Sequence, residues 1–570
     1  MTVVSATTGT PAAASMRRLA DCLAHWARRT PDAHAVSDEA GCWTYRQLAQ
    51  RVGDAERYLR ELGVAAGDRV MLVGENSAAL AALILAAGRL DAWAVLENAR
   101  RAPLEVDAVM RMAQPRRTVF VASASPDAAA HAARHGASVQ DAPFGQVAAA
   151  TGRCRGGDDD AGLGHDLGHD LDHDPDHGDP DAAAEPVHED PREQVAVLIY
   201  TTGSTGTPKG VMLTHANLLY IAETMRTLRR LEPRDRVYGV LPITHVMGLS
   251  SGLLGTLASG AHIRLVARFS PEACLRALRE DGITILQGAP AMFARLVKAA
   301  PAVPAAPAAQ VVPAAPTPPA ASAIPATPAT SADTRPGPTL RFIAIGGAPL
   351  DPALKAQAEA LFGLTLHNGY GLTEASATCW TRLDDANADC AVGPPTPGVE
   401  VSIRDAAGRA VPPGETGELW LRGANLMKGY YRAPELTARA LDAHGWFNSE
   451  DLATQEADGR IRIVGRSKDL IIRSGFNVSP LEVETALNAH PGVQQSAVLG
   501  CAVQDNEEIV AAIEPAPGAA PSEQELQRFL AERLSPYKRP SRIVFVDALP
   551  VAPNGKVLKP QLRRLIGETP

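Results

Sequence analysis

Before about residue 393, short apolar runs of strand-like composition alternate with helical segments such as Pro271–Arg279. The runs that we interpret as strands are Arg69–Val73, Thr118–Val121, Val195–Tyr200, Arg236–Leu241, His262–Val266, Thr284–Gln287 and Leu340–Ile345. Strands that alternate with helices along a chain are typical of strand–helix–strand units. The pattern therefore predicts α/β architecture with largely parallel sheets in a large N-terminal domain.

The pattern changes after about Gly393, where short strands are separated by tight turns. Val399–Arg404 and Gly417–Arg422 are examples, and they predict a small β-rich subdomain. From about Ser467, strands mix with two expected helices in a small α+β domain. The sequence Ser-Pro-Leu-Glu at 479–482 combines a capping box with a proline in the first turn and predicts the start of one helix. We expect domains of residues 1–466 and 467–570.

Two segments do not fit the globular pattern. Arg155–Asp190 is crowded with Asp, Gly and His, and its histidines His165, His169, His173 and His177 recur every four residues. On a helix they would form a metal-binding stripe, but the glycines and prolines among them oppose a helix. We interpret this segment as a solvated, disordered insert, with adventitious metal binding as the alternative. Pro301–Pro338, which is nearly all Ala, Pro and Thr, predicts an extended linker.

Composition limits the class of protein. A chain of 570 residues is longer than one hydrophobic core usually organises, which agrees with at least two domains. Hydrophobic residues at 45% supply ample core material. The formal net charge of −9 argues against a surface that coats nucleic acid. Any site for a polyanionic ligand must therefore be locally basic.

The cysteines and the apolar runs bear on the location of the protein. The cysteines, at positions 22, 42, 154, 274, 379, 390 and 501, form no Cys-x-x-Cys pair. This scatter predicts reduced thiols rather than disulfides or a zinc site. The N-terminus lacks the basic and apolar segments of a signal peptide, and the longest apolar run, Ala78–Ala87, is too short to span a bilayer. We expect a cytoplasmic protein without an integral membrane segment.

One loop is poorly suited to packing a core. TTGSTGTPKG, residues 201–210, follows the strand-like run Val195–Tyr200 and precedes a helix-like segment. A strand, a Gly/Ser/Thr loop and a helix form a phosphate-binding arrangement, in which glycines expose backbone N–H groups and a lysine supplies charge. The loop is not a P-loop, because Lys209 precedes Gly210 and Pro208 interrupts it. Taken alone, it is also compatible with a hydroxyl-rich turn without special function.

Further motifs follow the loop along the chain. They are Leu-Pro-Ile-Thr-His at 241–245, Asn-Gly-Tyr-Gly-Leu-Thr-Glu at 368–374, Gly-Trp-Phe-Asn-Ser-Glu-Asp at 445–451, Gly-Arg-Ser-Lys-Asp-Leu at 465–470 and Pro-Asn-Gly-Lys at 553–556. Together with the loop, they resemble in identity and order the motifs of the adenylate-forming superfamily. That superfamily includes acyl-CoA synthetases, 4-coumarate–CoA ligases, luciferases and adenylation domains. The resemblance covers the chain except its two inserts.

The resemblance implies a reaction in two halves. A carboxylate attacks the α-phosphate of ATP to give an acyl-adenylate and pyrophosphate, and a thiol then displaces AMP. It also implies a C-terminal domain that rotates between the half-reactions, with Lys468 as the hinge. ATP, Mg²⁺ and coenzyme A are the implied cofactors, and a small carboxylic acid is the substrate.

The same resemblance assigns roles to the motif residues. The implied phosphate cradle consists of Thr201, Thr202, Gly203, Ser204, Thr205, Gly206 and Lys209. Tyr370 would stack on adenine beside Gly346, Gly347 and Ala348, and the glycines around it favour close approach of a ligand. Thr373 would contact the α-phosphate, and Glu374 would bind Mg²⁺, which prefers oxygen ligands.

The remaining assignments concern the ribose and the two half-reactions. Asp451 would accept hydrogen bonds from both ribose hydroxyls, since a carboxylate accepts two at once, and Arg466 would add a donor. Lys556 would stabilise charge as the substrate carboxylate and the α-phosphate close. His245 resembles a gate between the acid site and the thiol tunnel. Gly475 would lie beside the pantetheine of CoA.

The acid and the thiol acceptor are less directly indicated. No Asp or Glu occurs from Pro242 to Arg264, where an amino-acid-activating domain carries a counterion for the substrate ammonium. The apolar residues of this segment are Val246, Met247, Leu249, Leu253 and Leu254, and they favour a hydrophobic fatty or aryl acid. CoA is the expected acceptor, and no carrier domain is expected after residue 570. Residues 537–539 would contact CoA phosphates or form a solvated basic turn.

Alternative functions remain open at this point. One is an acyl-AMP ligase that passes its product to an acyl carrier protein. A more distant one is a nucleotide-binding protein that kept the fold without catalysis, although Glu374, Asp451, Arg466 and Lys556 argue against it.

Overall fold

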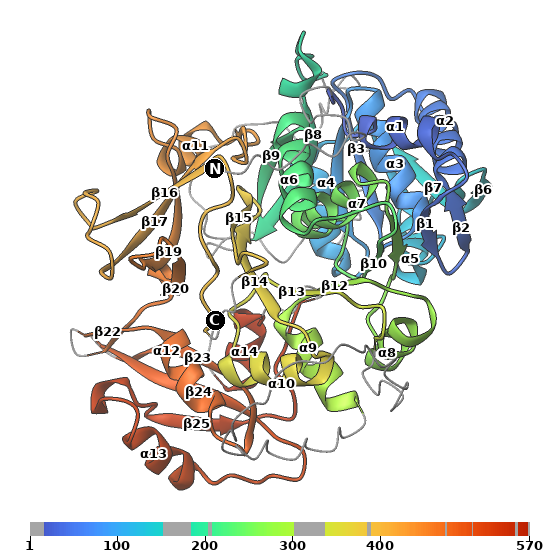
Figure 1. Ribbon diagram of the computed structural model, residues 1–570. Coiled ribbons are helices and arrows are strands. Elements are labelled where there is room, and N and C mark those ends of the chain that lie inside the picture. Colours follow the sequence, from blue (N-terminus) through green and yellow to red (C-terminus); the bar gives the residue numbers. More distant parts are fainter. Residues whose placement is uncertain are drawn as a thin grey trace, which may run out of the picture.

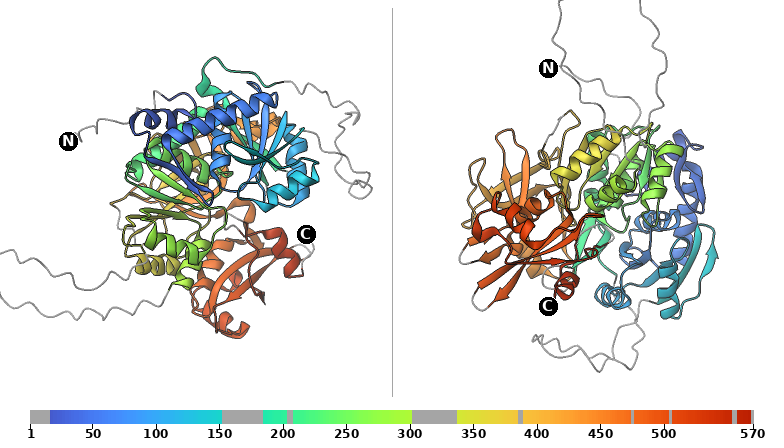
Figure 2. Two further views of the ribbon diagram at one scale, coloured as in Figure 1. Left: turned by 90° about the vertical axis from the view of Figure 1, so that its right-hand side faces the viewer. Right: turned by 90° about the horizontal axis from the view of Figure 1, so that it is seen from below.

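A computed structural model describes residues 16–151, 184–202, 208–300, 337–384, 389–473, 476–503, 506–552 and 557–567 (Figure 1). Within these residues, the strands form two eight-stranded sheets, a four-stranded sheet, a three-stranded sheet and a small hairpin. Figure 2 shows the C-terminal part, in red, as a unit packed against one side of the larger body. The predicted class, a parallel-rich α/β domain with a β-rich subdomain and a small α+β unit, is confirmed.

The first eight-stranded sheet positions many of the candidate site residues. Its order is β15-β14-β13-β12-β10-β11-β1-β2, parallel throughout except for the two outermost pairs. Its strands are β1 (His34–Asp38), β2 (Gly41–Thr44), β10 (Arg236–Gly239), β11 (His262–Leu265), β12 (Ile285–Gly288), β13 (Phe342–Ile345), β14 (Leu366–Leu372) and β15 (Ser376–Trp380). Parallel pairing brings the carboxyl ends of β10, β12, β13 and β14 to one edge, where ligands bind in open α/β sheets.

The second sheet carries the glycine-rich loop at one side. Its order is β18-β9-β8-β4-β3-β5-β7-β6, with a parallel centre of β8, β4, β3 and β5. The strands are β3 (Arg69–Gly74), β4 (Trp93–Asn98), β5 (Arg117–Val121), β6 (Gln140–Ala142), β7 (Gly145–Thr151), β8 (Val195–Thr202), β9 (Pro208–Thr214) and β18 (Gly429–Tyr430).

Helices cover the two sheets and fill the space between them. They are α1 (Asp21–Arg29), α2 (Tyr45–Glu61), α3 (Ala78–Arg89), α4 (Pro103–Ala113), α5 (Pro126–Arg134), α6 (His215–Leu228), α7 (Gly255–Ala258), α8 (Pro271–Glu280), α9 (Pro290–Ala299) and α10 (Pro352–Phe362), with a π-helix, η3 (Met247–Leu254), before α7. One hydrophobic cluster joins α3 and α6 to strands of both sheets.

The apolar run at residues 78–87 belongs to that cluster. It forms most of α3, in which every residue from Ala78 to Gly88 is buried. A helix packed on all sides needs no polar face, which explains why the run is apolar all round. Among the described residues, no helix combines the length and hydrophobicity needed to cross a membrane. The cytoplasmic location stays a prediction.

The β-rich subdomain is the antiparallel sheet β16-β17-β19-β20, which carries α11 (Pro434–Ala440) at its side (Figure 1). The strands are β16 (Val399–Arg404), β17 (Thr416–Gly423), β19 (Phe447–Gln455) and β20 (Ile461–Arg466). The pairing of β19 with β20 places Asp451 directly opposite Arg466. Two residues that are 15 apart in sequence therefore become neighbours in the sheet.

The C-terminal unit has hydrophobic clusters of its own, and their described members all come from residue 471 onward. It consists of β21 (Ile471–Arg473), β22 (Phe476–Val478), β23 (Val493–Val503), β24 (Asn506–Pro515), β25 (Arg542–Phe545), α12 (Pro480–Asn488), α13 (Glu523–Ala531) and α14 (Lys559–Leu565). The described residues thus contain three α-helices here, where the sequence predicted two helices.

The predicted capping box at residues 479–482 is wrong, although the helix begins where expected. α12 starts at Pro480, but Ser479 makes no side-chain cap. Instead, Ser479 Oγ donates to the carbonyl of Val464 on β20 (2.7 Å). The acceptor comes from another part of the fold, so the hydroxyl joins the C-terminal unit to the subdomain.

Glu484 on α12 makes stability depend on pH. Its Oε1 accepts a hydrogen bond from the N–H of Val498 (2.8 Å), and burial raises the pKa of the carboxyl from 4.5 to about 7. Because the folded pKa lies above the unfolded one, the contribution of this group to stability is complete below about pH 4.5 and is lost as the pH rises through 7.

We therefore expect Glu484→Gln to raise the free energy of unfolding at pH 8 and to change it little near pH 4.5. Denaturant unfolding of the two proteins at both pH values measures the effect. Glu482→Gln is the control, because Glu482 lies on the same helix, where its exposed side chain pairs with Lys538. An equal stabilisation at both pH values would contradict the assignment.

The segment interpreted as an insert ends in residues that are bound to the body. Glu185 pairs with the buried guanidinium of Arg69 (2.7 Å) and accepts a hydrogen bond from Tyr431 OH (2.8 Å). Its N–H donates to the carbonyl of Gly67 (2.9 Å). Glu185 therefore differs from the solvated insert that the sequence predicted, whereas the other residues of 184–190 are exposed. His165, His169, His173 and His177 lie outside the described residues, as do residues 301–336.

The described residues contain no cluster of three or more His, Cys, Asp or Glu side chains that could hold a metal ion. Every cysteine among them is a free thiol, and Cys154 lies outside this part of the chain.

Candidate active site

The glycine-rich loop joins two antiparallel strands, not a strand and a helix. β8 pairs with β9 up to Thr201 opposite Lys209 and Thr202 opposite Pro208. Helix α6 begins only at His215, where Thr214 and Asn217 form a capping box. The predicted strand–loop–helix arrangement is therefore wrong, because β9 stands between the loop and helix α6. An anion here would depend on the loop's own N–H and hydroxyl groups and on Lys209.

The strand β9 accommodates both Pro208 and Gly210. Pro208 is its first residue, where a missing N–H does not interrupt the ladder. A Cβ at Gly210 would lie 3.0 Å from Cζ of Tyr200, so the tyrosine ring occupies the place of a side chain. Four loop residues of the predicted cradle, Gly203 to Gly206, lie outside the described residues, and the side chain of Thr202 is not described.

Lys209 and Glu374 both contact Tyr430. The Lys209 ammonium lies 5.2 Å from the centre of the Tyr430 ring, a cation–π arrangement. The Tyr430 hydroxyl donates to Glu374 Oε1 (2.9 Å). Burial, and after it Glu374, raises the pKa of Tyr430 far above its ordinary value, so the phenol stays a donor. Tyr430 thus connects the loop lysine to the candidate metal ligand.

The turn at residues 373–375 accepts hydrogen bonds from β18 and from the segment before it. Met427 N–H donates to the carbonyl of Glu374 (2.7 Å), and Asn425 Nδ2 donates to the carbonyl of Ala375 (2.7 Å). A Cβ at Gly371 would lie 2.0 Å from the carbonyl oxygen of Ser376, so the hairpin closes only with glycine there. Thr373 is buried at 7% exposure.

Tyr370, Asp451 and Arg466 form one hydrogen-bonded group. The Tyr370 hydroxyl donates to Asp451 Oδ2, and Arg466 Nε donates to Asp451 Oδ1 (2.8 Å). The Asp451 side chain is 9% exposed. Burial, followed by Asp451, raises the pKa of Tyr370 well above its ordinary value. Burial alone would lower the pKa of Arg466, but Asp451 outweighs it and raises that pKa.

The backbone beside Asp451 is unusual. Glu450 has a left-handed φ of 58°, and its N–H donates to Asn448 Oδ1 (2.9 Å). Its carboxylate pairs with Lys468 (2.6 Å), and its carbonyl accepts from Ser467 Oγ (3.0 Å). Glu450 therefore connects the aspartate of the candidate ribose site to the predicted hinge.

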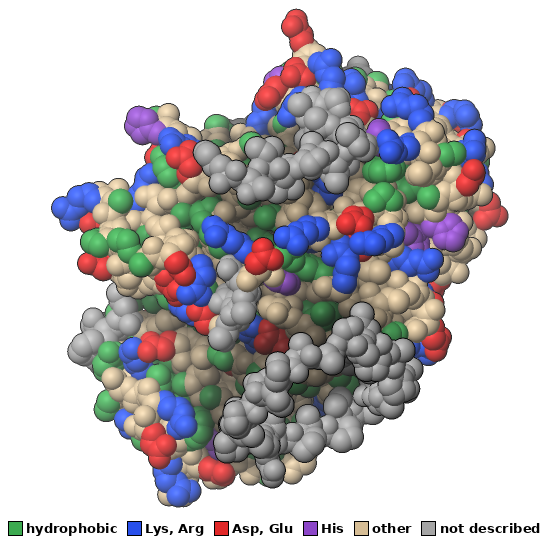
Figure 3. Space-filling view, viewed as in Figure 1, with side chains coloured by type: hydrophobic (Ala, Val, Ile, Leu, Met, Phe, Trp, Pro, Cys, Tyr) green, Lys and Arg blue, Asp and Glu red, His purple; other side chains and the backbone are tan. Residues whose placement is uncertain are grey.

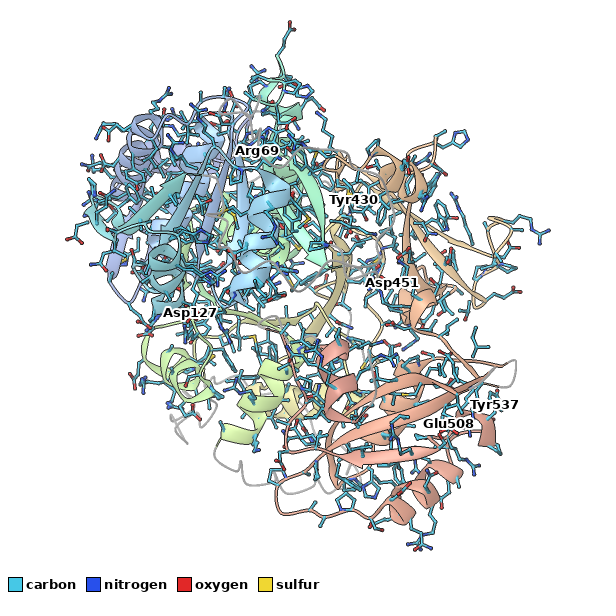
Figure 4. All side chains as sticks on the ribbon, turned by 180° about the vertical axis from the view of Figure 1, so that it is seen from behind. Arg69, Asp127, Tyr430, Asp451, Glu508 and Tyr537 are labelled. Atoms are coloured by element: carbon cyan, nitrogen blue, oxygen red, sulfur yellow. The ribbon has the colours of Figure 1, made fainter. Side chains whose placement is uncertain are left out.

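The Lys209–Tyr430–Glu374 group and the Tyr370–Asp451–Arg466 group lie at the same edge of the fold. Figure 4 shows Tyr430 and Asp451 on the same side of the molecule, with Asp451 in the subdomain of β16, β17, β19 and β20. Tyr370 belongs to β14, and Gly346, Gly347 and Ala348 follow the neighbouring strand β13. Gly347 has φ +83°, and a Cβ there would meet nothing within 4 Å, so open space lies beside this backbone.

Figure 3 shows Lys and Arg side chains gathered across the middle of one face, with acidic side chains among them. A chain of net negative charge thus carries locally basic surface.

The segment that contains His245 is positioned by Asn76. Asn76 Nδ2 donates to the carbonyls of Gly239 and Leu241 (both 3.0 Å), and its Oδ1 accepts from the N–H of Ile243 (2.8 Å). His245 is partly buried and precedes η3. The predicted apolar wall is mostly hydrophobic core, because Val246, Leu249, Leu253 and Leu254 are at most 3% exposed. Only Met247 among the five is partly exposed, and its Cε lies 3.0 Å from the Cβ position of Gly346.

The basic turn at residues 537–539 is largely engaged within the C-terminal unit. Lys538 pairs with Glu482 (2.6 Å), and Arg539 donates to the carbonyls of Leu534 (2.9 Å) and Ala531 (3.2 Å). In Figure 4, Tyr537 lies away from Tyr430 and Asp451. These contacts favour the structural interpretation over CoA phosphate binding. Lys556 and Gly475 lie outside the described residues.

Comparison with known families gives the affiliation of the chain. The AMP-binding enzyme family matches residues 23–431, and the C-terminal domain of AMP-binding enzymes matches residues 482–556. The chain belongs to the AMP-binding enzymes. This affiliation confirms the predicted membership of the adenylate-forming superfamily and places the chain among AMP-forming acid–thiol ligases.

Several relatives of this AMP-binding enzyme have names or structures. A feruloyl-CoA synthase from Amycolatopsis sp. is 33% identical over 546 residues, covering 95% of this chain and 97% of the relative. ATP-bound MatB from Rhodopseudomonas palustris has a TM-score of 0.75 at 28% identity, covering 95% and 98% of the two chains. The amide bond synthetase McbA from Marinactinospora thermotolerans has a TM-score of 0.73 at 27% identity, covering 95% and 99%.

Sequence reasoning missed Tyr430, Glu450 and Asn76. None of the three carries a periodic or spacing signal of its own, since each acts through a contact with a residue far along the chain or in another strand. The only indication near Tyr430 in the sequence is the preceding residue, Gly429, which has φ +144° in the structure.

Proposed function

We propose that the protein is an ATP-dependent carboxylic acid–CoA ligase. It converts an acid and ATP to acyl-AMP and pyrophosphate, and then acyl-AMP and CoA to acyl-CoA and AMP. The observation that carries the proposal is the presence of two hydrogen-bonded groups, Tyr370–Asp451–Arg466 and Lys209–Tyr430–Glu374, along one edge of the fold. One group suits a ribose and the other suits a metal-bound polyphosphate.

ATP is held at both ends in this arrangement. Asp451 accepts from the ribose hydroxyls, and Arg466 and Tyr370 keep its carboxylate in place. Tyr370 and the backbone of Gly347 and Ala348 contact the adenine. Thr201, Lys209 and the loop between them bind the β- and γ-phosphates. Thr373 binds the α-phosphate, which approaches the carboxylate of the acid.

Glu374 fits a magnesium ion. One carboxylate oxygen accepts from the neutral Tyr430 hydroxyl, and no described side chain donates to the other. A hard cation prefers such an oxygen, and magnesium usually takes one or two carboxylates together with substrate phosphates. When bound, the ion shields the charge of the phosphates. Tyr430 keeps Glu374 oriented for this role.

The acid is proposed to be uncharged beyond its carboxylate, either fatty or aryl. The absence of Asp and Glu between residues 242 and 264, and the named activity of the feruloyl-CoA synthase relative, both support this. His245 is proposed as the gate and Gly475 as the contact of the pantetheine. Loading of free CoA, compared with loading of an acyl carrier protein, distinguishes this function from that of an acyl-AMP ligase.

The two half-reactions require a movement of the C-terminal domain. We place the domain border after Arg466, where β20 ends and the short helix Ser467–Asp469 begins. Lys468 lies in that helix and is the proposed hinge.

Asp451→Ala should weaken ATP binding much more than acid binding. The ribose hydroxyls would lose a charged acceptor worth about 1.5–3 kcal/mol, or roughly tenfold to a hundredfold in Kd. Titration of the variant with each ligand measures both affinities. Asp405→Ala is the control, because Asp405 lies in an exposed turn of the same subdomain and pairs with Arg409. Unchanged ATP affinity in Asp451→Ala would remove Asp451 from the site.

A further inference from the structure

Gln287 has a buried side-chain amide whose NH₂ group donates no hydrogen bond to any described residue. The residue is 3% exposed, and its Nε2 has no hydrogen-bond partner in the described part of the chain. Buried polar groups are nearly always hydrogen-bonded, because an unpaired one loses its water without compensation. The amide therefore needs a partner that the described residues do not supply.

The neighbours of Gln287 in the sheet have small side chains. It stands next to last in β12, opposite Ala344 of β13. On the other side, β10 pairs Tyr238 with Leu286, so Gly239 comes opposite Gln287. Neither neighbour has a side chain longer than a methyl group. The side chain of Gln287 therefore stands on one face of the sheet, where neither of these two neighbours offers a polar side chain.

The position of Gln287 connects it to the acid side of the candidate site. In a strand, alternate residues share a face, so Gln287 points to the same side as Ile285. Ile285 and Ala344 belong to the cluster that includes Val246 and Leu249 of the segment after His245. The π-helix η3 contacts β10 and β15, and β12 and β13 lie between those strands in the sheet.

The carboxyl end of β12 also adjoins the candidate nucleotide residues. Gly288, the residue after Gln287, accepts a hydrogen bond through its carbonyl from the N–H of Gly346 (3.3 Å). Gly346 in turn lies against Met247, the first residue of η3. Gln287 is therefore next in sequence to the backbone that binds Gly346, and its strand lies between two strands that contact η3, the helix after His245.

We infer that Gln287 determines specificity by binding an uncharged oxygen group, a hydroxyl or carbonyl, at the end of the acid remote from its carboxylate. This inference rests on the proposed function. An amide offers one kind of donor and one acceptor, which suits a hydroxyl. A hydrocarbon end would leave Nε2 unpaired, and a second anion would be buried beside a neutral group.

Matched pairs of acids test the inference. The pairs are cinnamic and 4-hydroxycinnamic acid, benzoic and 4-hydroxybenzoic acid, and octanoic and 8-hydroxyoctanoic acid. Pyrophosphate release measures the rate of adenylation with each acid. We expect kcat/KM for the hydroxylated acid to exceed that of its parent at least tenfold in one or more pairs. Gln287→Met, which keeps the length and removes the polar group, should bring that ratio to within about twofold of one.

A second buried amide provides the control. Gln194 is fully buried, but its Oε1 accepts from the N–H of His188 (3.0 Å) and its Nε2 donates to the carbonyl of Asp91 (3.1 Å). Gln194→Met should lower Tm and leave the acid preference unchanged. Gln287→Met should leave Tm unchanged or raise it, because it removes an unpaired group.

The outcomes separate this inference from the proposed function. Pyrophosphate release without discrimination in any pair would overturn the inference alone. A preference for the hydroxylated acid that survives in Gln287→Met would also overturn the inference, and a lowered Tm of that variant beside it would assign Gln287 a structural role. No release with any acid would overturn the proposed function together with the inference.

Discussion

Replacing Lys556 with alanine is expected to lower the rate of acyl-adenylate formation by roughly 10²–10³-fold while sparing thioester formation from supplied acyl-adenylate. In the first half-reaction, a carboxylate approaches the α-phosphate, so two anions close on each other. A lysine between them would stabilise the charge that builds up in that transition state. The second half-reaction joins a thiol to a mixed anhydride and does not need the same stabilisation.

Single-turnover assays on one preparation of the variant measure the rates of both half-reactions. Lys559→Ala provides a matched control from the same region, because Lys559 pairs with Asp469 (2.7 Å) through side chains that are 38% and 33% exposed. Such an exposed pair is worth about 0–1 kcal/mol, so both half-reactions should stay within a few-fold of wild type. Equal losses in both steps of Lys556→Ala would point to a general binding role or to misfolding.

The elements that the sequence predicted well are those whose signal is local. The expected strand at Thr284–Gln287 is β12, Ile285–Gly288, and the expected helix at Pro271–Arg279 is α8, Pro271–Glu280. Both signals depend on short-range composition, namely an apolar run and a proline after an N-cap serine. The antiparallel strands of the subdomain were also predictable, because their turns are marked by glycine.

The errors arose where a distant group changed a local preference. Pro208 and Gly210 are poor strand residues, yet β9 forms because β8 and β18 pair with it on both sides. Ser479 had a capping partner within its own helix, but the carbonyl of Val464 bound its hydroxyl instead. Neither β18 nor Val464 is near these residues in sequence, so no local pattern indicated them.

The candidate site was predictable as a set of residues but not as a set of contacts. Motifs named Tyr370 and Asp451 separately, whereas their hydrogen bond joins residues 81 apart. The role of Tyr430 depends on a contact with Glu374, 56 residues away. The unpaired amide of Gln287 was invisible as well, because burial without a partner is a property of the packed sheet and not of a sequence pattern.

The proposed hinge can be tested through its backbone. Lys468 lies in the helical turn Ser467–Asp469 between the subdomain and the C-terminal unit. In the superfamily that the chain belongs to, one pose of the small domain serves adenylation and another serves thioester formation. Lys556 and Gly475 both fall within the proposed C-terminal domain, so one rigid arrangement could hardly serve both steps. A hinge absorbs such a movement in a few backbone torsions.

Proline at position 468 would restrict that movement in two ways. It fixes its own φ near −65° and disfavours the helical conformation of the preceding residue, which is Ser467. We expect Lys468→Pro to trap one pose, so that adenylation stays within roughly tenfold of wild type while CoA thioester formation falls by far more. Pyrophosphate release and single-turnover thioester formation measure the two steps.

Lys468→Ala separates the torsional effect from loss of the side chain. The Lys468–Glu450 pair is 2.6 Å long, with side chains that are 40% and 43% exposed, so its removal should cost about 0–1 kcal/mol. The alanine variant keeps both backbone torsions free and should therefore complete both half-reactions at nearly wild-type rates. A lysine on an ordinary exposed loop would respond differently, since proline would then lower stability and slow both steps alike. A parallel decline of the two half-reactions in Lys468→Pro would exclude the hinge.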